Sequence, residues 1–324
     1  MGYSQDGNWY SGFSGEQIDE RLSRATPEGT VGRNLLDNAY FVGGGTGYGV
    51  FPVNQRGDTQ YSGGNNYFDR WKGSTNISAL LQSDGVSVSS SGSSGVSFYQ
   101  ALSIAPLLGK TVTGSILTVG GTLYVGTGTL PSSVPESGNV YVFSIDTNVG
   151  KFNLVYVSAR SQLEFAITLP GTGRSIKLAA AKLELGSQQT LARQVNGSWV
   201  LNDPPPNYQQ ELAKCQRYLL VLDGTGNAYS YKEYIGSVTT TNQAGFYIPT
   251  PVTMASIPSV SLSGTSPVFS QFYSSPAVSG DVTAIGVNHI LANGLYVLAT
   301  CPGISSVGIV GLGLKGKIII SAES

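Results

Sequence analysis

The chain has 324 residues and a formal net charge of −1, with 18 Lys and Arg against 19 Asp and Glu. This length suits two domains. Charged residues make up only 11% of the sequence, less than half the usual share, and the basic residues form no cluster. This balance argues against nucleic acid and against insertion into or binding to an anionic membrane.

Residues 1–33 are expected to form an attachment segment with a short helix. Ser14-Gly-Glu-Gln17 has the form of a capping box, and Ile18, Leu22 and Ala25 follow at helical spacing. An amphipathic helix of about three turns is marginal alone, so its apolar stripe must pack on its own domain or on copies of itself. The first residues show neither a basic n-region nor an apolar h-region, so no secretory signal is recognised.

Residues 34–199 predict a jelly-roll β-sandwich. Short runs rich in Val, Tyr and Phe, such as "GNVYVFSID" and "KFNLVYVSA", alternate with Gly, Ser, Pro and Asn. Seven or more such runs are typical of a sandwich. Similar runs between residues 218 and 324 predict a second, C-terminal β-sandwich. The fold class is therefore mostly β.

Residues 200–217 interrupt this pattern with a Pro-rich junction and a helix. Asp203 and Asn207 are both candidate N-caps, and the residues after them recur at helical spacing. Cys215 lies on the apolar stripe, which favours a buried thiol over a disulfide with Cys301. The prolines and the helix are expected to hold the second sandwich at a fixed angle.

The segments "NLLDNAYF…FPVNQRGDTQYSGGNNYFDRWKG", "AAAKLELGSQQTLAR" and "NDPPPNYQQELAKCQRYL" resemble phage and prophage tail-fibre or receptor-binding proteins. In that family a carbohydrate-binding-module-like jelly roll carries the first two segments, and the third leads into a terminal β-domain. The resemblance covers roughly residues 12–220, while the last hundred residues match only in style. It implies host recognition, attachment to a tail or baseplate protein through the N-terminal segment, and a homotrimer.

Residues suited to catalysis are scarce, and no enzymatic activity is expected. Asp281 and the only histidine, His289, lie either side of a strand-like run, which gives no reason for them to meet. Glu164 and Glu184 lie in separate strand-like runs, and nothing in the sequence links them to one cleft. No metal site is predicted from Cys and His.

No cofactor is expected, although a structural Ca²⁺ stays open because jelly-roll modules often carry one. Asp37, Asp69 and loop carbonyls could supply its oxygen ligands.

The chain's 18 tyrosines are the main candidates for ligand contact. Tyrosine rings suit neutral, hydroxyl-rich ligands, because they stack on a sugar face while the phenol hydrogen-bonds. Core packing is the competing role for each of them. The candidate ligand-binding residues are Tyr229, Tyr231, Tyr234 and Tyr273 in the second sandwich, with Tyr61 and Tyr67 in the first.

The resemblance thus implies a structural, receptor-binding viral protein that recognises a bacterial surface glycan or another host receptor. It would be assembled in the bacterial cytoplasm, be released by lysis and work on the virion tail. The main contact is expected in residues 218–324, with the jelly roll as a weaker, secondary site. The alternative is a carbohydrate-binding module of a polysaccharide-degrading system.

Overall fold

The computed structural model describes most of the chain and divides it into two compact units. The described residues are 2–3, 9–10, 32–43, 51–92, 95–202, 205–224, 234–264, 266–272, 278–291, 294–304 and 308–322. The first unit comprises Met1–Val42, Ser62–Asn65 and Lys72–Pro205, and the second comprises Gly43–Tyr61, Asn66–Trp71 and Pro206–Ser324. The segments 43–61 and 66–71 thus belong to the second unit, although the sequence-based limits place them in the first sandwich.

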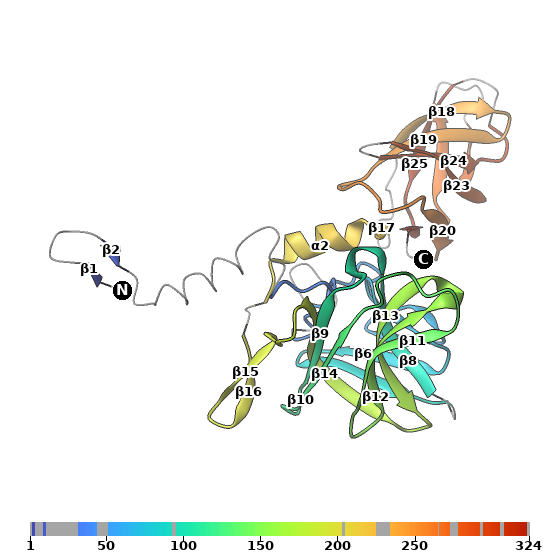
Figure 1. The fold of residues 1–324 in the computed structure, drawn as a ribbon. Coiled ribbons are helices and arrows are strands. Elements are labelled where there is room, and N and C mark those ends of the chain that lie inside the picture. Colours follow the sequence, from blue (N-terminus) through green and yellow to red (C-terminus); the bar gives the residue numbers. More distant parts are fainter. Residues whose placement is uncertain are drawn as a thin grey trace. The chain divides into compact units, whose positions relative to one another are not determined.

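The first unit is built on two six-stranded sheets (Figure 1). In order across the sheet, the first consists of β10 (Leu123–Thr129), β9 (Thr111–Thr118), β14 (Ser175–Leu185), β7 (Gly85–Ser90), β6 (Ile77–Gln82) and β3 (Gln60–Ser62). The second consists of β11 (Asn139–Asp146), β12 (Lys151–Val157), β13 (Gln162–Pro170), β8 (Gly95–Leu102), β5 (Lys72–Gly73) and β4 (Asn65–Asn66).

The two sheets of the first unit pack face to face around aromatic side chains. Phe143, Phe152 and Phe165 come from three neighbouring strands, and their rings meet edge to face at 5.0–5.1 Å. They lie against Gly114 of β9, where a side chain would collide with all three rings. The alternation of strand residues between two faces therefore places every second residue in this core.

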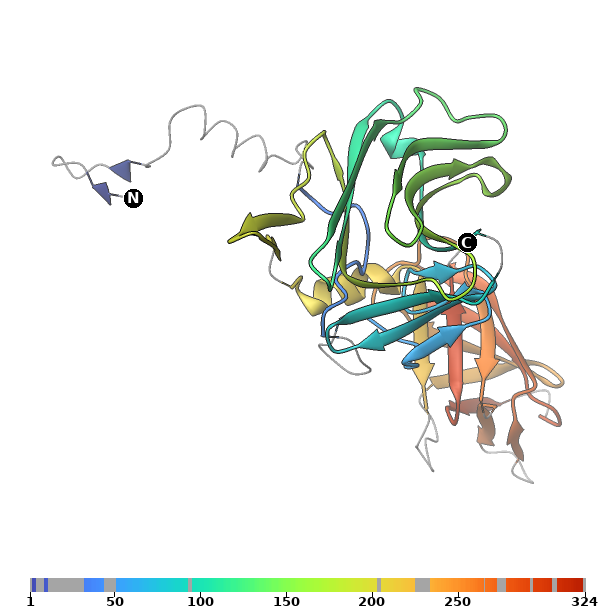
Figure 2. The same cartoon turned by 90° about the horizontal axis from the view of Figure 1, so that it is seen from below.

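The hairpin β15 (Ala192–Val195) and β16 (Ser198–Leu201) covers the outer face of the first sheet at its base. Ala192 and Leu191 join Leu117 and Ala180 in a small second core, against which Trp199 packs. The tip of the hairpin projects from the sandwich in both views (Figure 2). Two 3-10 turns, η1 (Ala105–Leu107) and η2 (Ser158–Arg160), lie in connections of this unit.

The junction contains helix α2 (Tyr208–Gln216). Its N-cap is Asn207, whose side chain accepts a hydrogen bond from the backbone of Gln210 at 3.1 Å. Asn207 caps the helix, because the chain at this residue is extended and its amide oxygen meets the first helical turn. The other candidate, Asp203, lies outside the described residues. Leu212 and Cys215 are buried, and both cysteines are free thiols, as the helical stripe predicts.

The second unit is built on a three-stranded and a seven-stranded sheet. The three-stranded sheet has the order β17 (Leu219–Asp223), β26 (Lys317–Ser321) and β20 (Ser259–Ser263). The seven-stranded sheet has the order β22 (Val278–Asp281), β21 (Val268–Phe272), β25 (Ile309–Gly313), β18 (Tyr234–Thr240), β19 (Gln243–Pro249), β24 (Gly294–Thr300) and β23 (Ala284–Leu291).

The core of the second unit lies between these two sheets. Phe246, Val297 and Leu312 from the larger sheet share one buried cluster with Ile318 and Ile320 of β26. Successive residues of a strand point to opposite faces, so the residues between these core positions lie on the outer face of the larger sheet. That outer face is where the candidate site is found.

A mostly-β fold with a helix in the junction is confirmed by these elements. Near the N-terminus β1 (Gly2–Tyr3) pairs with β2 (Trp9–Tyr10), and the helix expected within residues 1–33 lies outside the described residues. Among the described residues, no helix is long and apolar enough to cross a membrane.

Candidate functional site

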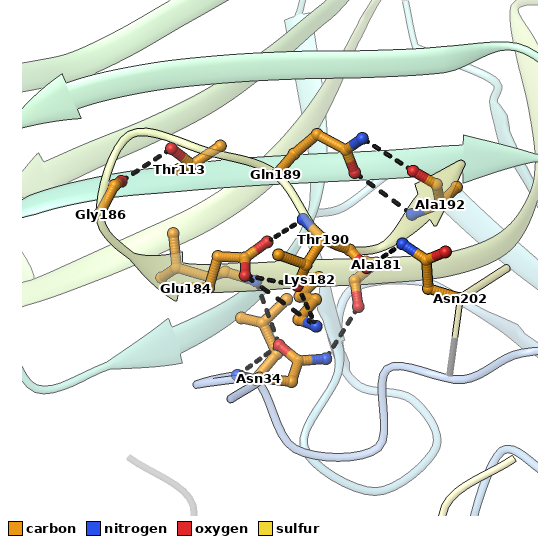
Figure 3. Close-up of polar contacts among 12 residues, drawn as sticks. Asn34, Thr113, Ala181, Lys182, Glu184, Gly186, Gln189, Thr190, Ala192 and Asn202 are labelled. Carbon is orange, nitrogen blue, oxygen red and sulfur yellow. Dashed lines mark hydrogen bonds and ion pairs between the residues drawn. The ribbon is translucent and has the colours of Figure 1, made fainter. Parts of the chain in front are cut away.

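A buried polar network explains two of the sequence motifs, and it lies on the covered outer face of the first sheet (Figure 3). Glu184 is fully buried and accepts hydrogen bonds from the backbone and hydroxyl of Thr190, both at 2.7 Å. Lys182 donates to the same hydroxyl at 2.7 Å and lies 4.0 Å from the carboxylate. The side chain of Asn34 bridges Ala181 and Leu183. A buried charge needs such partners, so this network acts as scaffold.

The "NQRG…DRW" part of the first segment forms a second polar cluster, which belongs to the second unit. The carboxylate of Asp69 is fully buried and accepts from the backbone of Gln55 at 2.9 Å and from its side chain at 2.6 Å. The same Gln55 amide donates to the carbonyl of Leu219 at 2.8 Å. The Arg70 guanidinium lies 3.5 Å from the ring centre of Tyr218, a cation–π contact. The "NQRG…DRW" segment thus contacts the residues at the start of β17 and stabilises their position.

For Tyr61 and Tyr67 the prediction of ligand contact is corrected, because both rings are buried in this same segment. Tyr67 is 1% exposed and Tyr61 is 7% exposed, and the two rings stack at 5.7 Å. The Tyr61 hydroxyl donates to the side chain of Asn54. Burial raises the pKa of Tyr61, so the hydroxyl stays protonated and available for this bond. Neither ring presents a free face to a sugar.

The other predicted ligand residues are only partly described. Tyr229, Tyr231 and Tyr273 lie outside the described residues. Tyr234 begins β18, is partly buried and packs against the core of the second unit. The six candidate tyrosines are therefore not brought together into one described site.

A different aromatic row lies on the outer face of the seven-stranded sheet. Tyr247 of β19 and Tyr296 of β24 are directly opposite each other in the register. His289 of β23 is the next partner across the sheet, and its ring stacks on Tyr296 at 6.4 Å with 23° between the ring planes. Ile235 on β18 extends the row and is 66% exposed. The row crosses four adjacent strands, β18, β19, β24 and β23.

Glycines on the neighbouring strands determine how the two tyrosine rings lie. A side chain at Gly294 would come within 2.5–2.6 Å of the outer ring atoms of Tyr247. A side chain at Gly245 would in the same way collide with the ring and hydroxyl of Tyr296. Each ring therefore lies across a glycine of the opposite strand, flat on the sheet rather than upright. A flat ring turns one π-face to the sheet and the other outward.

The sequence carries a signal for this arrangement that the search for loop tyrosines missed. The two strands share a Gly-x-Tyr pattern, Gly245-Phe-Tyr247 and Gly294-Leu-Tyr296. In an antiparallel pair with the two tyrosines opposite each other, each ring can reach the glycine of the partner strand. Each strand supplies the glycine beneath the other strand's tyrosine, so the repeated pattern places two flat rings side by side.

This face suits a neutral ligand with alternating apolar and hydroxyl surfaces. Tyr247 is 42% exposed and His289 is exposed as well, while the row and its glycines carry no Asp, Glu, Lys or Arg. Exposed aromatic rings offer apolar area at low entropic cost, with a phenol at the edge for hydrogen bonds. The geometry can therefore bind a saccharide ring by stacking.

The residues considered for catalysis lie in different settings. Asp281 is the last residue of β22, whereas His289 lies within β23, opposite Tyr296. Glu164 pairs with Arg160 at 2.8 Å, whereas Glu184 belongs to the buried network on the other sheet. Glu164 and Glu184 thus each have their own structural partner.

The two candidate Ca²⁺ ligands also have separate settings. Asp69 accepts hydrogen bonds from Gln55 in the second unit, while Asp37 belongs to the first unit and bonds through its backbone to Gln100. In the part of the chain that the structure describes, no group of three or more His, Cys, Asp and Glu residues could hold a metal ion.

Comparisons with known proteins identify no relative of this chain: no family model, no curated protein and no solved structure matches it.

Proposed function

We propose that the chain is a receptor-binding structural protein of a phage or phage-derived particle, and that it recognises a neutral saccharide on a bacterial surface. The observation that carries this proposal is the row of Tyr247, Tyr296 and His289 on the outer face of the second unit's larger sheet, with Tyr247 and His289 exposed and Tyr296 half-buried. The resemblance of the three sequence motifs to tail-fibre proteins supplies the biological setting.

The row supports recognition rather than turnover. Its rings are placed by the sheet itself, through the glycines beneath them, so little order has to be gained when a ligand binds. Two stacked rings contribute about 1–3 kcal/mol beyond the apolar area that they bury. Such weak sites bind strongly only when several copies act together, which agrees with the proposed homotrimer.

The polar networks support the same proposal from the scaffold side. Residues of the family motifs make buried hydrogen bonds within the protein, for example Glu184 in the first unit and Asp69 in the second. Loops and outer faces remain free to differ without disturbing these networks. Binding by the second unit, attachment through the N-terminal segment and work on the virion tail are parts of this proposal.

A glycan array tests the proposal directly. The full chain is applied to arrays that carry bacterial surface saccharides beside cellulose, xylan and other storage or wall polysaccharides. Binding to neutral bacterial saccharides supports receptor recognition. Binding restricted to the degradable polysaccharides would instead favour the alternative, a carbohydrate-binding module, and binding to neither class contradicts saccharide recognition.

A further inference from the structure

The first unit has a hollow of about 310 Å³ at one end of its second sheet. Its walls are the turn between β11 and β12 and the connection that follows β13. Asp146, Asn148 and Lys151 line it from the first turn, and Thr168, Pro170 and Arg174 line it from the other side. The volume lies at the small end of the range for ligand sites and suits one sugar residue with a substituent.

The turn that forms the first wall is rigidly built. The backbone of Thr147 donates to Gly150 at 2.8 Å, and its hydroxyl accepts from the backbone of Gly150 at 2.9 Å. A side chain at Gly150 would collide with the carbonyl of Thr168, so the turn lies directly on β13. The hydroxyl of Tyr124 donates to the side-chain oxygen of Asn148 at 2.6 Å. This bond leaves the amide N–H groups of Asn148 for a ligand.

The second wall is equally well fixed. The backbone of Ser90 donates to the carbonyl of Arg174 at 2.9 Å, and Gly173 donates to Ser90 at 2.8 Å. Arg174 is therefore anchored at its backbone while its side chain is exposed and lines the hollow. Among the described residues, none accepts a hydrogen bond from its guanidinium.

Among the residues that the structure describes, the charges around the hollow leave one cation without a counterion. Asp146 pairs with Lys151 at 3.2 Å, so these two side chains largely neutralise each other. Arg174 is the remaining charged group of the lining. A guanidinium presents a fork of N–H donors that matches a carboxylate or a phosphate. The amide of Asn148 can serve sugar hydroxyls beside it.

We propose that this hollow is a second binding site, which takes an anionic sugar residue through Arg174 and Asn148. The anionic group is the carboxylate of a uronic acid or the phosphate of a sugar phosphate, since the guanidinium suits both. The site uses residues of the first unit only. It is therefore independent of the aromatic row, and each proposal can fail without the other.

Titration calorimetry on the full chain tests this site with three probes: galacturonate, glycerol 3-phosphate and uncharged galactose. At least one anionic probe is expected to bind about tenfold or more tightly than galactose, and added salt should weaken it. The identity of the tighter anionic probe then decides between carboxylate and phosphate. Failure of both anionic probes to bind, or equal binding of galactose, overturns the proposal.

Two variants make the test specific to the hollow. Arg174→Gln should weaken binding of the anionic probe about tenfold or more, because it removes the positive charge. The side chain is exposed, so the substitution should leave the fold intact. Arg33→Gln removes an exposed arginine elsewhere in the first unit and should leave binding unchanged. The proposal is wrong if Arg174→Gln binds like the unmodified chain, or if Arg33→Gln loses as much affinity. Thermal unfolding of both variants checks that each stays folded.

Discussion

At the scale of single residues, glycine decides where aromatic side chains are usable. Gly245 and Gly294 have no side chain, so Tyr296 and Tyr247 can lie across them with one face outward. Tyr61 and Tyr67 are equally suitable candidates in the sequence, yet their rings stack on each other inside the fold. Counting tyrosines therefore says little about ligand contact, whereas the neighbour across the strand pair says much.

The substitution Gly245→Ala tests this relation without touching an aromatic residue. The new methyl group would occupy the place of the Tyr296 ring, which can swing away because it is the end of a side chain. We expect saccharide binding to weaken about three- to tenfold, consistent with the loss of roughly 1 kcal/mol of stacking. Stability should change by no more than about 1 kcal/mol. Unchanged affinity in calorimetry would show that the flat ring is irrelevant.

Cys301 provides a pH-dependent prediction. Burial raises the pKa of its thiol from 9.0 to about 12, so the thiol stays protonated in the folded protein at pH 8. Ellman's reagent should label neither Cys301 nor the buried Cys215 until the chain is unfolded. Because the folded pKa is the higher one, stability from this group is complete below about pH 9 and is lost as the pH rises towards 12. Rapid labelling of the native protein at pH 8 would contradict this burial.

At the scale of elements, a buried carboxylate stabilises the part of the second unit that comes early in the chain. Asp69 ties Gln55 in place, and Gln55 in turn reaches Leu219 at the start of β17. The contact joins residues that are 164 positions apart in the sequence. Such a cluster stabilises only when complete, since each buried polar group depends on the others.

Asp69→Ala should therefore destabilise the second unit strongly. It leaves the partly buried N–H groups of Gln55 without their buried acceptor, a loss of about 2–4 kcal/mol. The matched control is Asp58→Ala, an exposed position of the same segment, which should change stability by less than about 0.5 kcal/mol. Differential scanning calorimetry measures both. Equal unfolding temperatures for the two variants would rule out a structural role for this carboxylate.

The elements themselves were largely predictable from local pattern, while their long-range partners were not. Alternating Val, Tyr and Phe predicts strands such as β11 and β12, and the cap and apolar stripe predict α2 with Cys215 buried. The assignment of residues 43–61 and 66–71 to the same unit as Pro206–Ser324 could not be predicted locally, because it depends on contacts between distant segments. The Gly-x-Tyr repeat was readable in the sequence, but its meaning required the register of β19 and β24.

At the scale of the whole molecule, the second unit cannot be tested by simply removing it. A chain cut after Arg217 would lose Leu219 and Tyr218, the partners of Gln55 and Arg70. The buried cluster around Asp69 would then be left incomplete, and misfolding would imitate a loss of binding. Point substitutions on the outer face avoid this, because they leave both buried polar networks intact.

Assembly is also a property of the whole chain. The low charge of the sequence leaves surfaces with little electrostatic protection, which suits burial against identical copies. The number of copies comes from the family resemblance, which implies three. Light scattering at micromolar concentration should give a mass three times that of one chain. A monomeric mass would contradict the homotrimer.

The most direct test of saccharide recognition by the aromatic row is the affinity of the full chain for the best glycan of the array, measured by titration calorimetry with matched tyrosine variants. Tyr247→Ala and Tyr296→Ala should each weaken binding about tenfold. Tyr141→Ala removes a tyrosine of β11 that is 57% exposed on the first unit, and it should change the affinity less than about twofold. If Tyr247→Ala and Tyr296→Ala bind as tightly as the unmodified chain while Tyr141→Ala does not, recognition belongs to the first unit and not to the aromatic row.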